Sequence, residues 1–241
     1  MIEPRGKTQP VAADCVPAHG VILDLDGTLA DTLEDLAAAV NFAVGSAGFG
    51  PFEASQVRPM VGDGLAVLIA RAAPSASDED RAEMTRRFRA YYGNHFLDRT
   101  RLYPGWPDAL DALTQRRVPL AVLSNKPDDF TRAIVDRLMS RWSLAAVLGQ
   151  RPDLPLKPDP AGALELCSRL GLRPSEVLLV GDSPNDIETA KRAGMRGVGV
   201  TWGFRSEKEL RDAGAETLIH APGELLLRLP KRHRVETAAP Q

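Results

Sequence analysis

Two aspartates stand two positions apart directly after a short apolar run, in the segment Asp24-Leu25-Asp26-Gly27-Thr28. Residues two apart in an extended chain point to the same side, so both carboxylates are expected to face one pocket. Close carboxylates repel each other, and a divalent cation such as Mg²⁺, which prefers oxygen ligands, relieves that repulsion. In such a site Asp24 can attack phosphorus as a nucleophile, and Asp26 can give and take the proton of the leaving group.

Further polar groups follow other apolar runs, and each has an ordinary structural reading beside the chemical one. Ser124 and the backbone N–H of Asn125 can donate to phosphate oxygens, and Lys157 can neutralise them. Asp182 is expected to hold the metal, with Asp186 in support. Taken singly, the Asp-x-Asp segment is also typical of a turn, Ser124 and Asp186 of helix caps, and Lys157 of a solvated side chain.

These groups need a scaffold that brings them together, and the apolar runs supply one. Continuous apolar runs separated by helical patterns predict an α/β fold with a parallel sheet covered on both faces. Ligands of such sheets bind at the carboxyl ends of the strands, so the polar groups are expected on one rim. The runs lie at residues 21–23, 119–123, 145–148, 177–180, 198–200 and 217–219.

One long stretch interrupts the alternation of strands and helices. From about Thr32 to Tyr103 the sequence has helical periodicity, roughly at 33–47, 63–73 and 78–97, and no convincing strand. Ordinary connections are far shorter, so this stretch predicts a separate lid. The segment Asp31-Thr32-Leu33-Glu34 has the spacing of a capping box and predicts the start of its first helix.

Composition limits the classes of partner. The chain has 241 residues, 44% of them hydrophobic, and a formal net charge of −2, so it carries no broad basic field for nucleic acid or an anionic membrane. No apolar run is long enough to span a bilayer, and the N-terminal residues lack a signal peptide's apolar stretch. Two cysteines are too few for a disulfide framework. We therefore expect a cytoplasmic protein in which any anionic substrate, such as the small phosphorylated metabolite that the polar groups above suit, is bound by local charges in a pocket.

Four segments together resemble the ordered motifs of the haloacid dehalogenase superfamily. They are the segment Asp24–Thr28 and Ser124-Asn125-Lys126-Pro127, then Lys157-Pro158-Asp159-Pro160 and Gly181-Asp182-Ser183-Pro184-Asn185-Asp186. The resemblance spans about residues 20–220 and is closest to the phosphoglycolate phosphatases. It implies a Rossmann-like core and a phosphatase that passes the phosphoryl group through an aspartyl phosphate.

The resemblance also implies a role for each motif residue. Asp24 would be the nucleophile and a Mg²⁺ ligand. Asp26 would be the acid and base and would give its backbone carbonyl to the metal. Ser124 and Asn125 would hold the phosphoryl group, and Lys157 would neutralise it.

Asp182 would complete the metal site with Asp186 behind it, and Gly62 would contact the substrate from the inserted segment. That segment, residues 32–103, would be an all-helical cap with hinges near 30–32 and 103–105, closing over the substrate to exclude water.

The predicted division of the chain follows from these assignments. Residues 19–31 and 104–227 form the α/β core, and residues 32–103 form the cap. Residues 1–18 and the basic segment 228–241 are expected to be disordered tails.

Several functions remain open at this stage, with 2-phosphoglycolate as the favoured substrate. Another small-molecule phosphatase, a pyrophosphatase or a sugar phosphomutase would use the same intermediate, and a receiver-like phospho-accepting domain would carry similar side chains without turnover. Asp26 argues against a dehalogenase, and the absence of lysine from residues 32–103 argues against a phosphonatase. Whether the protein is a monomer or a dimer is left open.

Overall fold

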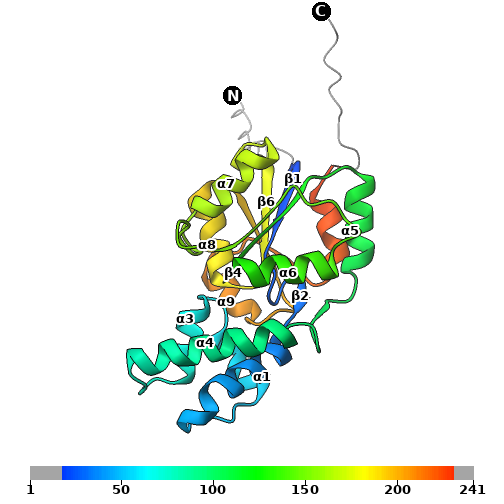
Figure 1. Ribbon diagram of the computed structural model, residues 1–241. Coiled ribbons are helices and arrows are strands. Elements are labelled where there is room, and N and C mark those ends of the chain that lie inside the picture. Colours follow the sequence, from blue (N-terminus) through cyan, green and yellow to red (C-terminus); the bar gives the residue numbers. More distant parts are fainter. Residues whose placement is uncertain (1–17, 231–241) are drawn as a thin grey trace, which may run out of the picture.

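A six-stranded parallel sheet forms the centre of the protein in the computed structural model, which describes residues 18–230 (Figure 1). The strand order is β5-β4-β1-β6-β7-β8. All neighbouring strands are parallel, as the continuous apolar runs predict. The strands are β1 (Gly20–Leu23), β4 (Leu120–Pro127), β5 (Ala146–Gln150), β6 (Val177–Gly181), β7 (Arg196–Val200) and β8 (Thr217–Ile219).

Both faces of the sheet are covered, which explains why its strands are apolar throughout. Val21 and Leu23 point into one apolar cluster and Ile22 into another, and all three are fully buried. The first cluster includes α5 (Trp106–Gln115), α6 (Asp128–Leu138) and the 3₁₀ segment η4 (Pro222–Arg228), and the second includes α7 (Ala161–Leu170) and α8 (Pro184–Ala193). A third, smaller cluster joins α8 to α9 (Glu207–Asp212).

A group of helices lies between β2 (Ala30–Asp31) and β3 (Arg101–Leu102), and we call residues 32–100 the helical insert. Its elements are α1 (Leu33–Val44), η1 (Gly45–Ala47), α2 (Ala54–Val57), η2 (Arg58–Met60), α3 (Leu65–Ala72) and α4 (Asp78–His95). Figure 1 shows these helices gathered at one end of the sheet. They share a separate apolar cluster, to which Phe130 and Phe204 of the sheet-bearing part also belong.

The two-residue strands β2 and β3 pair antiparallel, with Ala30 opposite Leu102. The sequence predicts no strand within 32–103, and this is wrong for β3 because two residues are too short to show an alternating pattern. The predicted capping box is wrong as well. Its spacing makes Asp31 the N-cap and Glu34 its partner, whereas the N-cap of α1 is Thr32, which makes no side-chain capping bond.

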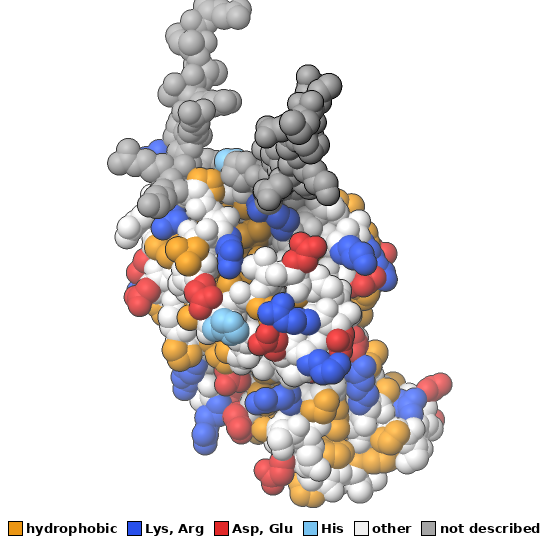
Figure 2. Space-filling view, turned by 180° about the vertical axis from the view of Figure 1, so that it is seen from behind, with side chains coloured by type: hydrophobic (Ala, Val, Ile, Leu, Met, Phe, Trp, Pro, Cys, Tyr) orange, Lys and Arg blue, Asp and Glu red, His pale blue; other side chains and the backbone are white. Residues whose placement is uncertain are grey.

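The predicted tails fall mostly outside the described residues, which leave out 1–17 and 231–241. Of the remainder, Ala18 and Leu229 are buried in the core, and η4 ends at Arg228. Among the described helices, none is both long and apolar enough to cross a membrane. Figure 2 shows basic and acidic side chains interspersed over one face of the molecule.

Candidate active site

The polar groups singled out in the sequence lie at the carboxyl ends of three neighbouring strands. Asp24 follows β1, Ser124 and Asn125 lie in the last half of β4, and Asp182 follows β6. Because β4 and β6 flank β1, these groups meet at one edge of the sheet, where the strand order reverses direction. They line a pocket with about 660 Å³ of space, part of it open to solvent; the other predicted residues on its wall are Asp26, Gly62 and Lys157.

Lys157 joins two of the carboxylates from beneath the pocket. Its ammonium lies 2.8 Å from Asp24 Oδ1 and 2.6 Å from Asp186 Oδ1, and it donates to the Leu123 carbonyl at 3.1 Å. An ammonium has three protons, so these contacts use all of its donors. Lys157 is therefore held in one place, and its positive charge is fixed beside Asp24.

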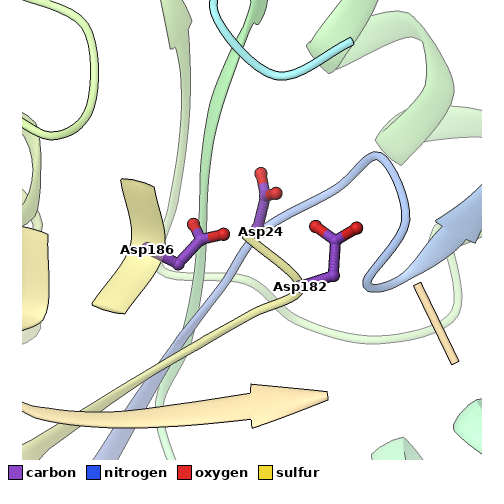
Figure 3. Close-up of side chains that lie close together, drawn as sticks. All are labelled: Asp24, Asp182 and Asp186. Atoms are coloured by element: carbon purple, nitrogen blue, oxygen red, sulfur yellow. The ribbon is translucent and has the colours of Figure 1, made fainter. Parts of the chain in front are cut away.

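Three acidic side chains surround one small space (Figure 3). Asp24, Asp182 and Asp186 each offer one oxygen, and these oxygens lie within 4.8 Å of one another. The backbone N–H of Phe204 donates to Asp182 Oδ2 at 2.6 Å, and the Ser183 hydroxyl donates to Asp186 Oδ2 at 2.6 Å. All three aspartates are buried and fixed by their neighbours, although Asp186 lies behind the wall that faces the pocket.

The charges of this cluster do not balance among the described residues, because three carboxylates face the single ammonium of Lys157. Burial raises the pKa of Asp24 to about 7; Lys157 lowers it, and Asp186 raises it further. Burial likewise raises the pKa of Asp182 well above its ordinary value, with Asp24 and Asp186 adding to the rise. Burial opposes the charge of Lys157, but Asp186 and Asp24 outweigh it and raise the lysine's pKa.

A divalent cation fits this donor set. It would add the two positive charges that the three carboxylates lack, and buried carboxylate oxygens are the ligands that Mg²⁺ prefers. Asp24, Asp182 and Asp186 are the residues that could hold it.

Asp26 is not among these three residues, although it is close to Asp24 in sequence. Its Oδ1 accepts from the Thr32 hydroxyl at 2.7 Å and from the Lys126 ammonium at 3.0 Å, and its Oδ2 lies 3.1 Å from the same ammonium. The Thr32 hydroxyl is thus bonded to Asp26 and does not cap α1.

Lys126 is a site residue to which the sequence reading gives no role. It is buried, it lines the pocket, and its ammonium lies 4.7 Å from the centre of the Tyr92 ring. Burial raises the pKa of Tyr92 to about 12 despite the nearby ammonium, so the phenol keeps its proton near neutral pH. The signal was present in the sequence, since Lys126 belongs to the segment that follows the second strand, but a lysine after a strand is usually solvated.

Asn125 links the helical insert to the sheet edge. Its Nδ2 donates to the carbonyls of Gly62 and Lys157, both at 2.9 Å, and its Oδ1 accepts from the Lys157 N–H at 2.8 Å. Asn185 adds a second link, because its Nδ2 donates to Asp63 Oδ1 at 2.7 Å. The side-chain amide of Asn125 is thus engaged with backbone groups, and it holds Gly62 at the pocket.

The far wall of the pocket is apolar and comes largely from the insert. Its apolar residues are Leu36, Val61, Leu65, Leu68, Phe88, Phe130 and Phe204. Arg205 also lines the pocket, and its guanidinium donates to the carbonyls of Arg58, Pro59 and Val61. Sequence reasoning missed Arg205 because nothing in its local pattern distinguishes it from a surface arginine.

Comparison with known proteins gives consistent results for sequence and fold. A family profile described as haloacid dehalogenase-like hydrolase matches residues 21–200. The chain is 33% identical over 211 residues to a phosphoglycolate phosphatase of Mannheimia succiniciproducens, covering 84% of this chain and 94% of that protein. It is also 33% identical to phosphoglycolate phosphatase 1 of Pseudomonas aeruginosa, covering 86% of this chain and 78% of that protein.

Solved structures agree with this likeness. The crystal structure of a predicted phosphoglycolate phosphatase from Haemophilus somnus superposes with a TM-score of 0.81 at 30% identity, covering 87% of this chain and 97% of that one. A crystal structure from Lactobacillus delbrueckii subsp. bulgaricus gives a TM-score of 0.82 at 29% identity, covering 88% and 99%. The parallel sheet and its helices are therefore similar to solved structures along most of their length.

Proposed function

Because the chain belongs to the haloacid dehalogenase-like hydrolase family, we propose that it is a Mg²⁺-dependent phosphatase acting on a small phosphomonoester, with 2-phosphoglycolate as the expected substrate. One observation carries the proposal: a fixed lysine and three buried carboxylates share one edge of the sheet, with Asp24 in contact with the lysine. The names of the relatives in Mannheimia and Pseudomonas support the choice of substrate.

The proposed reaction begins at the carboxylate of Asp24. One of its oxygens forms a bond to phosphorus while the bond from phosphorus to the leaving oxygen breaks, and Asp26 gives that oxygen a proton. In the second half, Asp26 takes a proton from water as the water oxygen attacks phosphorus and the bond to Asp24 breaks. Inorganic phosphate leaves, and both aspartates return to their starting state.

The other residues bind and orient the phosphoryl group. Lys157 holds Asp24 in place at 2.8 Å and supplies positive charge to the phosphoryl oxygens. Ser124 lines the pocket beside Asp24, where its hydroxyl can donate to the same oxygens. When bound by Asp24, Asp182 and Asp186, Mg²⁺ supplies the positive charge that brings an anionic phosphoester to this carboxylate-rich edge.

The helical insert is proposed to act as a cap over the reacting groups. Leu65, Leu68 and Phe88 from the insert form part of the pocket wall, and Asn125 bonds the Gly62 carbonyl. An apolar wall at this position excludes bulk water, which strengthens the electrostatic interactions within the pocket.

A phosphate-release assay tests the proposal. The protein is incubated with Mg²⁺ and a panel of phosphoesters that includes 2-phosphoglycolate, pyrophosphate and hexose phosphates, and the substrates are ranked by kcat/KM. Phosphate release from at least one small ester, with 2-phosphoglycolate first in rank, is the expected result. Transfer of the phosphoryl group between sugars without release would indicate a mutase, and a stable phosphoprotein without turnover would indicate a receiver-like domain.

A further inference from the structure

Three cations line the pocket, and they differ in how many of their protons are already bonded. Lys157 uses all three on Asp24, Asp186 and the Leu123 carbonyl. The Arg205 guanidinium gives three of its five protons to backbone carbonyls of the insert, and its Nε lies 3.9 Å from Glu209 Oε1. Lys126 donates to the two oxygens of Asp26 and otherwise faces Tyr92, so at least one of its three protons has no carboxylate or carbonyl acceptor among the described residues.

A second donor without a partner lies next to this ammonium. The Tyr92 hydroxyl is buried and makes no hydrogen bond within the described part of the chain. Tyr92 lines the same pocket, and its ring centre is 4.7 Å from Lys126 Nζ. A buried donor without an acceptor is costly, and a ligand oxygen in the pocket would satisfy it.

The side chains around Lys126 and Tyr92 indicate which chemical group of a ligand would bind to them. Around Tyr92 the pocket wall is apolar, because its ring stacks on Phe88 and meets Phe130 edge-on, and Leu36 belongs to the same apolar cluster. An ammonium and a phenol proton side by side match the two oxygens of a carboxylate, and a low-polarity wall strengthens such charge-assisted bonds.

Distance limits where that carboxylate sits in the substrate. Lys126 Nζ lies 3.0 Å from Asp26 Oδ1. An ester oxygen that accepts a proton from Asp26 lies about 3 Å from it, so this oxygen and Nζ are at most about 6 Å apart. A carboxylate one or two carbons from the ester oxygen therefore falls within hydrogen-bonding reach of Lys126, whereas one at the end of a long chain overshoots it.

We propose that Lys126 and Tyr92 form the subsite that binds the leaving-group carboxylate, and that the protein selects phosphate esters of short hydroxy acids. This rests on the proposed phosphatase function and adds to it the two residues that set the choice of leaving group. Lys126 is then a specificity-determining residue whose spare proton, rather than its bond to Asp26, recognises the substrate.

The test compares two esters that share a two-carbon chain, 2-phosphoglycolate and ethyl phosphate, of which only the first has a carboxylate. The measured quantity is the ratio of their kcat/KM values, because general damage to the catalytic groups affects both esters and cancels. Wild type is expected to prefer 2-phosphoglycolate. Lys126→Met should lower the ratio by about ten- to hundred-fold, and Tyr92→Phe by about two- to ten-fold.

Tyr91→Phe is the matched control, since Tyr91 is next to Tyr92 on α4 but stacks on the exposed Phe42 and on His95. Its ratio should equal that of wild type. If Lys126→Met does not accumulate as folded protein, the ratio measured for Tyr92→Phe decides between the outcomes, because that substitution removes a single oxygen.

The outcomes separate this inference from the proposed function. A ratio that stays constant while both kcat/KM values fall would mean that Lys126 only positions Asp26, and the subsite proposal would be overturned. Wild type that hydrolyses both esters equally well would also overturn it, while leaving a phosphatase in place. Wild type that hydrolyses no ester of the panel would remove the proposed function itself.

Discussion

Two buried lysines form ion pairs with different carboxylates of the site. Lys157 bonds Asp24 and Asp186, whereas Lys126 bonds Asp26. Two aspartates that are only two positions apart in sequence therefore have different electrostatic surroundings. Different surroundings would suit the two roles proposed for them, with Asp24 as nucleophile and Asp26 as the group that exchanges protons.

Replacing Asp24 by Asn tests the nucleophile directly. An amide oxygen is a poor nucleophile, so turnover of the preferred ester should fall below about 1% of wild type. The variant should still fold, because a neutral side chain of the same shape removes a buried charge. Phosphate release and circular dichroism measure the two effects, and substantial residual turnover would contradict the assignment of Asp24.

The raised pKa of Asp24 predicts a pH-dependent stability in the metal-free protein. Its pKa rises from 3.8 to about 7 on folding, mainly through burial. A carboxyl group of this kind stabilises the folded state at low pH, and its contribution is lost as the pH rises through that interval. The free energy of unfolding of wild type minus that of Asp24→Asn should therefore fall between pH 4 and pH 7, by on the order of a few kcal/mol.

Urea unfolding in EDTA at several pH values measures this difference. Adding Mg²⁺ should flatten the dependence, because a cation among the three carboxylates stabilises their ionised form. A difference that stays constant or rises with pH in EDTA would contradict the prediction.

Metal removal gives a further prediction at the same site. EDTA should reduce turnover to background, and excess Mg²⁺ should restore it, because three carboxylates and one ammonium leave an uncompensated negative charge where the phosphoester must bind. Asp182→Asn should need a higher Mg²⁺ concentration for half-maximal turnover, by about ten-fold or more. Full activity after chelation would exclude the metal from the mechanism.

The sequence indicated much of this chemistry but not all of it. Asp24, Ser124 and Asp182 could be placed together because each follows a strand of a parallel sheet, and such strands end on one edge. Lys126 and Arg205 could not be assigned, since their roles depend on groups brought from distant segments. No residue near Lys126 in sequence indicates that its ammonium lies over the Tyr92 ring.

At the scale of elements, the return from the helical insert to the core is fixed by one buried carboxylate. Asp35 on α1 accepts from the backbone N–H groups of Arg99 and Thr100 and from the Thr100 hydroxyl, all at 2.7–3.1 Å. These residues directly precede β3. The first helix of the insert, α1, is thus bonded to residues 99–100, through which the chain returns to the core.

Asp35→Ala should destabilise the protein by roughly 2–4 kcal/mol, because the buried N–H and hydroxyl of Thr100 and the part-buried N–H of Arg99 lose their acceptor. Urea unfolding measures the loss. Glu34→Ala, at the exposed neighbouring position, should stay within about 0.5 kcal/mol of wild type. Equal stability of both variants would show that the return segment does not depend on Asp35.

The elements themselves were predictable where their pattern was long. The six core strands appear as apolar runs because both of their faces are buried, and α1, α3 and α4 follow the predicted helical segments. Short elements were not predictable. The four-residue helix α2 and the two-residue strands β2 and β3 are set by tertiary contacts, as is the use of the Thr32 hydroxyl by Asp26.

At the scale of the whole molecule, the helical insert and the sheet-bearing part pack against each other, and both contribute residues to one pocket. Phe130 and Phe204 from the sheet-bearing part join the apolar cluster of the insert, and Arg205 bonds carbonyls of the segment 58–61. Residues of both parts line the pocket that holds Asp24, so the proposed cap would make access depend on the size of the ester.

Large phosphoesters should therefore be poor substrates. A phosphoserine peptide of about ten residues should be hydrolysed at least a hundred-fold more slowly, by kcat/KM, than the best small ester, because the insert residues Leu65, Leu68 and Phe88 wall the pocket and obstruct a peptide chain. Free phosphoserine serves as the control for the chemistry of the ester. Similar rates for the peptide and for free phosphoserine would show that the insert does not restrict entry.

The antiparallel contact between β2 and β3 has a consequence for how such proteins diversify. Ala30 lies opposite Leu102, so the chain enters and leaves the helical insert at adjoining points. Closely spaced ends are the arrangement at which foreign segments are best tolerated, since the host loses few contacts. Recombination can exchange everything between these two points and leave all six sheet strands intact. A lineage can thereby keep Asp24, Ser124 and Asp182 while it exchanges the insert residues that wall their pocket.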